Sequence, residues 1–203
     1  MLSTRRAAQV GLGATGAILV VCMGVLVAGN KPAPVSPAAH APDFRLMDLD
    51  RNPVSLSAYQ DKTVVLVFHS LRCPTSNAYR FRLTRLADEL AGSAQIILIN
   101  SYVRHEDAPA VGEIRSQSRA ARHTFPTLLD PTGETAKAYE VQVTPTVVLV
   151  DRGLIRYQGA FDDNQNEAMV HQRYCEDAVR AVLDQRPPAV AFTQAFGCPI
   201  RPK

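Results

Sequence analysis

The chain has 203 residues, of which 46% are hydrophobic and 20% charged, a composition typical of a globular protein with a proper core. Its net charge is only +3, it has no run of basic residues, and it contains no tryptophan and few other aromatic residues. A nucleic-acid-binding protein needs a basic patch or aromatic stacking platforms, so the composition excludes nucleic acid as a partner.

The first 29 residues are predicted to be a targeting segment. Arg5 and Arg6 precede an almost wholly small or aliphatic stretch, residues 7–29, which is long enough to span a bilayer. The basic flank places the start of the chain in the cytoplasm. We therefore expect one N-terminal hydrophobic helix that serves as a signal anchor and exports the domain, membrane-anchored, to the periplasm or cell exterior. The alternative is a signal peptide cleaved after Val27-Ala28-Gly29, which would release a secreted domain.

Residues 30–42 are rich in proline and alanine and are predicted to form a semi-extended linker, so that the folded domain occupies residues 43–203. The leader also contains the pattern GxGxxG, from Gly11 to Gly16. A dinucleotide-binding fingerprint must follow a strand, and no strand fits in the few residues before it. No cofactor is therefore expected.

Within the domain, short apolar runs alternate with stretches of helical spacing. Continuous apolar runs of this length are typical of buried strands. In chain order the predicted elements are a strand at 64–68, a helix at 74–90, a strand at 95–100, a helix at 107–122, strands at 146–150 and 154–158, and a helix at 168–183. This alternation predicts an α/β fold with helices on both faces of a sheet.

Cys73 lies at the junction between the first strand and the first helix. Free backbone N–H groups and the positive end of a helix dipole stabilise a thiolate there, and Arg72 adds a neighbouring positive charge. Pro74 is tolerated in the first helical turn. Ser76 stands where a CxxC motif would have its second cysteine and is expected to hydrogen-bond the thiolate. We interpret Cys73 as a redox nucleophile, although a buried inert cysteine is the simpler alternative.

Thr144 and Pro145 precede the strand at 146–150. Proline cannot donate a hydrogen bond to a sheet, so an unusual turn is expected there, and a cis Thr144–Pro145 bond would suit it. His69 is interpreted as the polar end of its strand, because the other histidines lack the spacing of metal ligands. No metal site is predicted.

Three cysteines lie in the exported part of the chain, namely Cys73, Cys175 and Cys198. In an oxidising compartment an odd number leaves one thiol unpaired unless a partner takes it. Three arrangements remain open: a functional Cys73–Cys198 pair, a structural Cys175–Cys198 disulfide, or no intramolecular pair. Cys175, within the last predicted helix, is expected to be a packed thiol.

Several motifs together resemble the redoxin family of alkyl hydroperoxide reductase/thiol-specific antioxidant (AhpC/TSA) type. They are Phe68–Pro74, Val143–Asp151, the opening segment Ala41–Phe44, Tyr157–Asp163 and the ending Phe196–Ile200. The lone Cys-Pro motif and the Gly-Cys-x-Ile tail are similar to one bacterial subgroup. The resemblance implies a thioredoxin-like fold with a central mixed sheet, and it implies that Thr144-Pro145 lies beside Cys73.

The resemblance and the thiol together predict an exported thiol-disulfide oxidoreductase with Cys73 and Cys198 as catalytic residues. Arg72, Pro74, Ser76, Thr144 and Pro145 are expected to support the thiolate or bind substrate. The expected partners are a disulfide-bearing protein or a peroxide, an external thiol reductant, and the membrane through the N-terminal helix. A thiol peroxidase is the first alternative, although Leu66 replaces the proline of the peroxidase pattern. The second alternative is a non-catalytic, membrane-tethered binding module.

Overall fold

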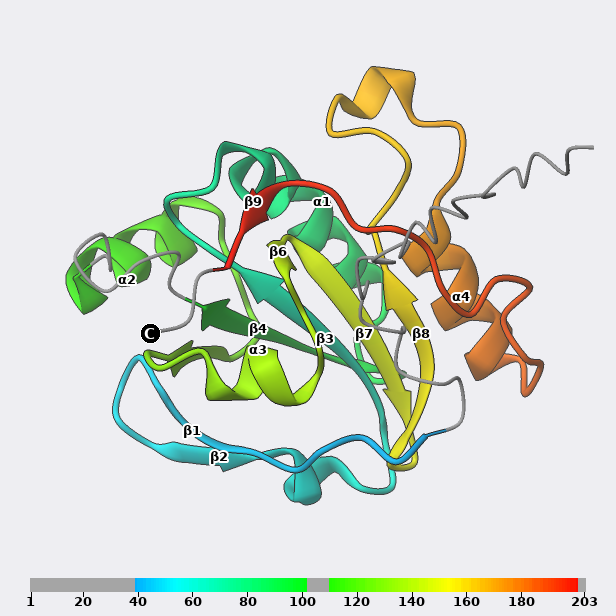
Figure 1. Cartoon of the computed structure of the whole chain (residues 1–203), viewed down its shortest axis with the longest axis horizontal. Coiled ribbons are helices and arrows are strands. Elements are labelled where there is room, and N and C mark those ends of the chain that lie inside the picture. The colour runs from blue at the N-terminus through cyan, green and yellow to red at the C-terminus, as the bar shows by residue number, and fades with distance from the viewer. Residues whose placement is uncertain (1–38, 102–109, 201–203) are drawn as a thin grey trace, which may run out of the picture. The chain divides into compact units, whose positions relative to one another are not determined.

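The apolar run that follows Lys62 forms the centre of the sheet. This strand, β3 (Thr63–His69), is buried along its whole length, as expected for a strand covered on both faces. It pairs in parallel with β4 (Gln95–Ser101) and antiparallel with β7 (Thr146–Asp151). The structure is a computed structural model, and it describes residues 39–101 and 110–200 (Figure 1).

The main sheet is mixed and has the strand order β2-β1-β5-β4-β3-β7-β8. Its remaining members are β1 (Arg45–Asp48), β2 (Pro53–Ser55), β5 (Thr127–Asp130) and β8 (Leu154–Gly159). Two further strands, β6 (Val143–Thr144) and β9 (Cys198–Pro199), pair antiparallel as a separate two-stranded sheet. β9 comes from the end of the described chain and lies beside β6 (Figure 1).

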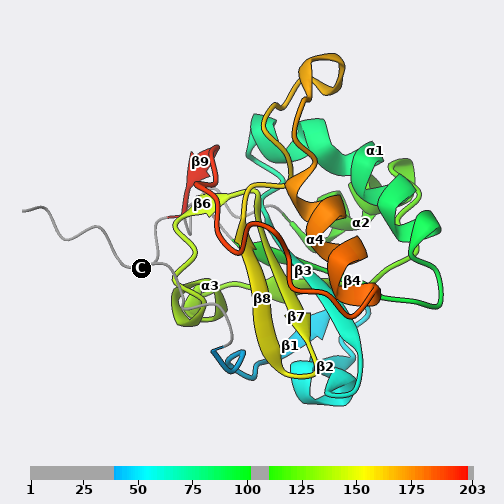
Figure 2. The same ribbon diagram turned by 90° about the vertical axis from the view of Figure 1, so that its right-hand side faces the viewer.

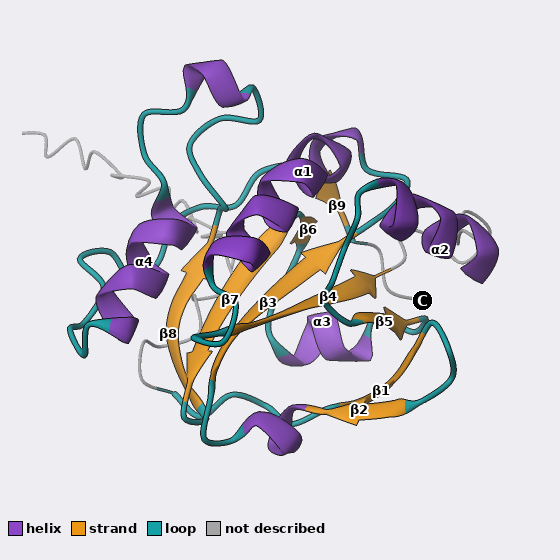
Figure 3. Ribbon diagram, turned by 180° about the vertical axis from the view of Figure 1, so that it is seen from behind, coloured by secondary structure: helices purple, strands orange, loops and turns teal. Residues whose placement is uncertain are grey.

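Helices cover both faces of the main sheet. α1 (Pro74–Glu89) and α4 (Tyr174–Leu183) lie on one face, with α2 (Val111–Ala120) beyond α1, whereas the short α3 (Glu134–Ala138) lies on the other (Figure 3). Two 3-10 turns, η1 (Leu56–Tyr59) and η2 (Glu167–Met169), complete the secondary structure of the described residues. Apolar side chains fill a separate core on each side of the sheet, one under α1 and α4 and the other under α3 and η1.

These elements confirm the predicted α/β fold with a mixed central sheet. The predicted strands and the helix after Cys73 agree with the structure to within one or two residues. The last helix is shorter than predicted: α4 begins at Tyr174, because residues 170–173 are not helical and follow the 3-10 turn η2. The start of the helix predicted at 107–122 lies outside the described residues.

The targeting segment at 1–29 and most of the linker lie outside the described residues. The linker's last four residues, 39–42, already pack on the domain. His40 forms a β-bridge with Leu154, the Ala41 N–H donates to the Gly153 carbonyl (2.9 Å), and the Tyr139 hydroxyl donates to the Pro42 carbonyl (2.6 Å). Within residues 39–101 and 110–200, no helix has the length and apolar character needed to cross a membrane.

After α4 the chain turns back and crosses the sheet edge toward β6, as the red segment of Figure 2 shows. Two backbone hydrogen bonds fix this return to β8: Gln158 N–H donates to the Ala191 carbonyl (3.0 Å) and Thr193 N–H donates to the Gln158 carbonyl (3.1 Å). The Thr193 hydroxyl also accepts from the Ala160 N–H at 3.0 Å. The tail is thereby held on the edge strand before it reaches the site.

Candidate active site

Cys73 is the N-cap residue of α1, so its side chain lies among the free N–H groups of the first helical turn. The Ser76 N–H donates to the Cys73 sulfur at 3.4 Å. Pro74 occupies the first helical position, where an N–H group would have no partner in the helix. The local sequence therefore places the thiol where the helix can stabilise its negative charge.

The segment before β7 lies directly beside this thiol. The Thr144–Pro145 peptide bond is cis, as the sequence suggested. The Cys73 thiol donates to the Thr144 carbonyl oxygen across a distance of 3.1 Å. Residues separated by more than 70 positions in the chain thus form one site, because β3 and β7 are neighbours in the sheet.

The C-terminal tail brings a second thiol to the same place. In the β6–β9 pair, Cys198 lies opposite Thr144, and the Ile200 N–H donates to the Gln142 carbonyl at 2.7 Å. From this position the Cys198 side chain interacts with Cys73. All three described cysteines are free thiols. The structure therefore brings Cys73 and Cys198 together and forms no disulfide among the described cysteines.

Gly197 makes this approach possible. Its φ of +145° belongs to the region that favours glycine, and a Cβ atom there would overlap with the carbonyl oxygen of Thr144. The sequence identified the Gly-Cys pair only as part of a resemblance. The contact itself depends on the tertiary path of the tail.

The two paired thiols have shifted acidities in opposite directions. Burial alone would raise the pKa of Cys73, but hydrogen bonds from Cys198 and Ser76 outweigh it and lower that pKa below its ordinary value. Burial and the neighbouring Cys73 raise the pKa of Cys198 to about 11. At neutral pH the pair therefore contains one thiol suited to be a nucleophile and one that stays protonated.

Arg72 lies apart from this cluster. Its side chain is about half exposed and pairs with Glu113 at 3.2 Å. The main groups that lower the pKa of Cys73 are Cys198 and Ser76 rather than Arg72. Ser76 is fully buried beside the sulfur, to which its backbone N–H donates.

Cys175 belongs to a different environment. It is buried on the inner face of α4 among the apolar side chains of the core. Burial and the negative charges of Glu176 and Asp162 raise its pKa. Cys175 is thus the packed thiol that the sequence predicted, and it does not join the pair.

His69 is also buried. It lines a small cavity of about 20 Å³ together with Asn100 and His123, and its Nδ1 has no hydrogen-bond partner. A cavity of this size suits one water molecule. Burial, and then the proximity of His123, lowers the pKa of His69 to about 3, so the imidazole is neutral. In the described part of the chain, no three His, Cys, Asp or Glu side chains gather as metal ligands would.

A buried ion pair that the sequence did not reveal holds the helix that carries Cys73. Arg82 of α1 pairs with Asp162, which also accepts a hydrogen bond from the Tyr79 hydroxyl at 2.9 Å. Both charged side chains are 2% exposed. Arg82 also donates to the carbonyl of Asn164 at 3.0 Å, so the ion pair joins α1 to the loop before α4. No local pattern marked these residues, because they come from distant parts of the chain.

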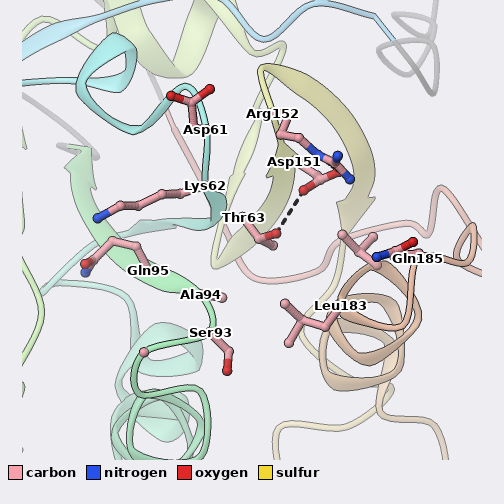
Figure 4. A pocket seen from close by; sticks show the side chains of 12 residues that line it. Asp61, Lys62, Thr63, Ser93, Ala94, Gln95, Asp151, Arg152, Leu183 and Gln185 are labelled. Atoms are coloured by element: carbon pink, nitrogen blue, oxygen red, sulfur yellow. Dashed lines mark hydrogen bonds and ion pairs between the residues drawn. The ribbon is translucent and has the colours of Figure 1, made fainter.

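A depression of the described surface lies at the other end of the sheet (Figure 4). It measures about 520 Å³, and its walls include Lys62, Gln95 and Arg152. Inside it the Thr63 hydroxyl donates to Asp151 at 2.9 Å. β3 runs from Thr63 at this end to His69 near Cys73, about 20 Å at the usual rise of a strand. The depression contains no thiol and is separate from the site.

Comparison with known proteins identifies the family and the fold of the chain. The model of the AhpC/TSA family matches residues 37–158, more than half of the chain. A hypothetical protein from Sinorhizobium meliloti is 28% identical, with a TM-score of 0.76 over 84% of this chain and 97% of the other. An uncharacterised conserved protein from Geobacillus kaustophilus is also 28% identical, with a TM-score of 0.74 over 83% and 93%.

A putative thiol:disulfide interchange protein from Chlorobium tepidum is more distant and supports only the thioredoxin-like fold. It is 24% identical, with a TM-score of 0.54 over 61% of this chain and 84% of the other. No curated protein matches the sequence.

Proposed function

Since the chain belongs to the AhpC/TSA family, a family of thiol-dependent oxidoreductases, we propose that it is an exported thiol-disulfide oxidoreductase in which Cys73 is the nucleophile and Cys198 the resolving thiol. The observation that carries this proposal is the pair itself. Two thiols meet at the start of α1, the pKa of one is lowered, and the pKa of the other is raised to about 11.

In the first step the Cys73 thiolate attacks one sulfur of a substrate disulfide. A bond forms between Cys73 and that sulfur while the substrate S–S bond breaks, and the second substrate sulfur leaves as a thiolate. The Ser76 N–H and the first turn of α1 stabilise the attacking anion. Before the thiol ionises, its S–H donates to the Thr144 carbonyl oxygen, which holds the sulfur beside the segment that precedes β7.

In the second step Cys198 resolves the mixed disulfide. The hydrogen bond and negative charge of Cys73 both raise the pKa of Cys198, and the mixed disulfide has neither. Cys198 then loses its proton more easily, attacks the Cys73 sulfur and releases the bound substrate sulfur as a thiolate. The substrate has gained two electrons, and the protein holds a Cys73–Cys198 disulfide. An external thiol reductant restores the two thiols.

The other residues expected to support the thiolate or bind substrate have different positions, and we propose different roles for them. Pro74 starts the helix, and Pro145 turns the chain into β7, so both set the backbone around the sulfur. Arg72 is exposed at the rim and is suited to contact a partner rather than the thiolate. The proposed partners are a disulfide-bearing protein, with a peroxide as the alternative substrate, and an external thiol.

We assign the domain to the periplasmic or outer side of a membrane, anchored by the apolar segment at 7–29. The support is the basic flank of Arg5 and Arg6 and the absence of any charged residue between them and Lys31. A fused reporter enzyme that folds only after export tests this directly. Activity confined to the cytoplasm would contradict the proposal, and a mature protein that lacks residues 1–29 would indicate cleavage.

The catalytic proposal is tested by trapping its intermediate. The full-length protein and the variant Cys198→Ser are mixed with a disulfide-bonded protein, quenched with acid and analysed by peptide mass spectrometry. We expect a Cys73–Cys198 disulfide in the parent and a mixed disulfide between Cys73 and substrate in the variant. A Cys73 that remains unmodified in both would contradict the proposal. Rapid sulfenic acid formation at Cys73 with a peroxide, but no mixed disulfide, would identify a peroxidase.

A further inference from the structure

The nucleophile is closed off from solvent. Cys73 has an exposed fraction of 0%, and Cys198 of the tail lies against it. A sulfur from another protein must nevertheless reach the Cys73 sulfur in line with the bond that breaks. The tail therefore occupies the approach that a protein disulfide would need.

The tail occupies this approach as an extended strand. Val143 pairs with Pro199 and Thr144 pairs with Cys198, both antiparallel, and the Ile200 N–H extends the pairing to the Gln142 carbonyl. Main-chain pairing of this kind depends little on side chains, so an extended segment of another protein can use the same edge. The position opposite Thr144 is the one that presents a sulfur to Cys73.

One position of the bound strand does select a side chain. The residue before the cysteine passes so close to the Thr144 carbonyl that a Cβ atom would overlap with it, and its φ is +145°. Only glycine adopts this conformation and leaves this space without strain. A strand that binds as the tail does must therefore carry glycine immediately before its cysteine.

The tail is held at its two ends, one on each side of the residues that pair with Thr144. Thr193 is bound to β8 and Ile200 to Gln142, whereas Phe196, Gly197 and Pro199 between them are exposed. Such a short segment can be exchanged for a competing strand at a modest free-energy cost, because its hydrogen bonds are replaced by equivalent ones.

We propose that the edge strand β6 is a docking site for an extended peptide segment with a Gly-Cys pair, and that the tail at 193–200 is a tethered mimic of that substrate. The proposal rests on the proposed function and adds its substrate class. The preferred partner is a disulfide-bearing protein whose reactive cysteine follows a glycine in an extended, exposed segment. The docked tail excludes disulfides that cannot compete for β6.

The test compares two full-length variants that differ by one methyl group. Cys198→Ser keeps the tail in place without the resolving thiol, and Gly197→Ala added to Cys198→Ser forces the tail away from Thr144. The probe is a synthetic peptide with the tail sequence of residues 193–200, its cysteine in a mixed disulfide with thionitrobenzoate. The matched control peptide has alanine in place of the glycine, and 5,5′-dithiobis(2-nitrobenzoate) serves as the small disulfide.

Cys73 attacks the peptide sulfur and forms a disulfide with it, while thionitrobenzoate leaves as a coloured thiolate and is measured by absorbance. The tethered tail competes for β6 at an effective concentration on the order of millimolar. A free peptide at about a tenth of that concentration therefore occupies β6 only about a tenth of the time while the tail is in place, and its reaction should become about tenfold faster once the tail is displaced. We therefore expect the ratio of the peptide rate to the small-disulfide rate to rise about tenfold in the double variant. In that variant the glycine peptide should also react several times faster than the alanine peptide.

Equal rates for the two peptides would overturn the docking proposal, and so would a ratio of peptide rate to small-disulfide rate that is the same in both variants. The proposed function would still stand if Cys73 reacted with the small disulfide. If Cys73 reacted with neither the peptides nor the small disulfide, the proposed function itself would fail. Thr193→Ala in the Cys198→Ser background provides a second route, since it removes the hydroxyl that accepts from Ala160 without touching β6. It should shift the ratio in the same direction, and no shift in either variant would count against the tail as a competitor.

Discussion

Cys73 and Cys175 both have side chains that are closed off from solvent. Their exposed fractions are 0% and 1%, so removal from water opposes ionisation of both thiols. The pKa of Cys73 is nevertheless lowered, whereas that of Cys175 is raised. Burial alone therefore does not decide whether a cysteine in this fold is reactive.

The difference lies in the hydrogen-bond donors around each sulfur. Cys73 caps a helix, where the N–H of Ser76 is free to donate, and Cys198 adds a thiol donor from the tail. Cys175 lies inside the first turn of α4 on its apolar face, and its nearest charges, Glu176 and Asp162, are negative. The side chain of an N-cap residue can accept from the free N–H groups of the first turn, whereas Cys175 lies within the turn and its side chain packs into the apolar core.

The largest effect is expected when each of the two thiols is replaced separately. Cys73→Ser should reduce disulfide exchange to the uncatalysed rate, since a hydroxyl is a very poor nucleophile for sulfur at neutral pH. Cys175→Ala should leave exchange within about twofold and should lower the free energy of unfolding by about 1 kcal/mol, through loss of one buried heavy atom. Exchange is measured with an insulin-type protein disulfide, and stability is measured by urea unfolding. Loss of exchange in Cys175→Ala with normal stability would break the contrast.

The next test concerns the donor from the tail. Cys198→Ala removes a hydrogen bond that lowers the pKa of Cys73, so the pKa of Cys73 should rise. Cys198→Ser keeps a hydroxyl that can donate and is the matched control. In single-turnover reactions with a small disulfide, the pH midpoint of the Cys73 rate should lie higher in Cys198→Ala than in Cys198→Ser. Identical midpoints would show that Cys198 contributes nothing to the acidity of Cys73.

A smaller effect is expected at Ser76. Its hydroxyl also hydrogen-bonds Cys73, while its backbone N–H bond to the sulfur survives any side-chain change. A hydrogen bond to a charged group contributes about 1.5 kcal/mol, so Ser76→Ala should slow single-turnover exchange at neutral pH by about tenfold. Ser76→Cys would create a CxxC motif, and a disulfide between Cys73 and the introduced thiol should then replace the Cys73–Cys198 disulfide in peptide maps. An unchanged exchange rate in Ser76→Ala would mean that, at Ser76, only the backbone N–H stabilises the Cys73 thiolate.

The same contrast explains how much of the molecule was predictable from sequence. The strand before Cys73 and the helix after it were predicted because each carries a strong local pattern, namely a continuous apolar run and a helical periodicity that starts at Pro74. The pairing of Cys73 with Thr144 followed from a family resemblance, and the structure confirms it. The weakly patterned elements, such as β5 and α3, are short and were not predicted.

The position of Cys198 could be proposed from sequence but not chosen over the alternatives. Its approach to Cys73 depends on the path of the tail over β8. Thr193 fixes this path by packing against Gly159 so closely that a Cβ atom at residue 159 would overlap with it. Such contacts join residues more than 30 positions apart and leave no periodic signal. Arg72 illustrates the opposite case: it is adjacent to Cys73 in sequence, but its side chain turns outward to Glu113.

The smallest predicted effect is in stability, and it has opposite signs for the two buried thiols. The pKa of Cys73 is lowered in the native state, whereas the unfolded chain has the ordinary cysteine value of about 9. Between these two pH values the native protein has lost the Cys73 proton and the unfolded chain has kept it, so the free energy of unfolding rises with pH. For Cys175 the native pKa is raised, so above about 9 the unfolded chain loses a proton that the native state keeps, and stability falls. Each thiol changes the free energy of unfolding by at most about 1.4 kcal/mol per pH unit.

Urea unfolding of Cys73→Ala and Cys175→Ala from about pH 7 to about pH 10 measures these slopes, with the Cys198→Ser protein as the parent in both cases. That background keeps a hydroxyl beside Cys73 and removes the titration of Cys198. Relative to the parent, the stability deficit of Cys73→Ala should grow as the pH rises toward about 9, because the parent alone gains from ionising Cys73 in the native state. The deficit of Cys175→Ala should shrink above that pH, because the parent alone must keep an uncharged thiol in its core. Deficits that change in the same direction would mean that burial, rather than the donors around each sulfur, governs both thiols.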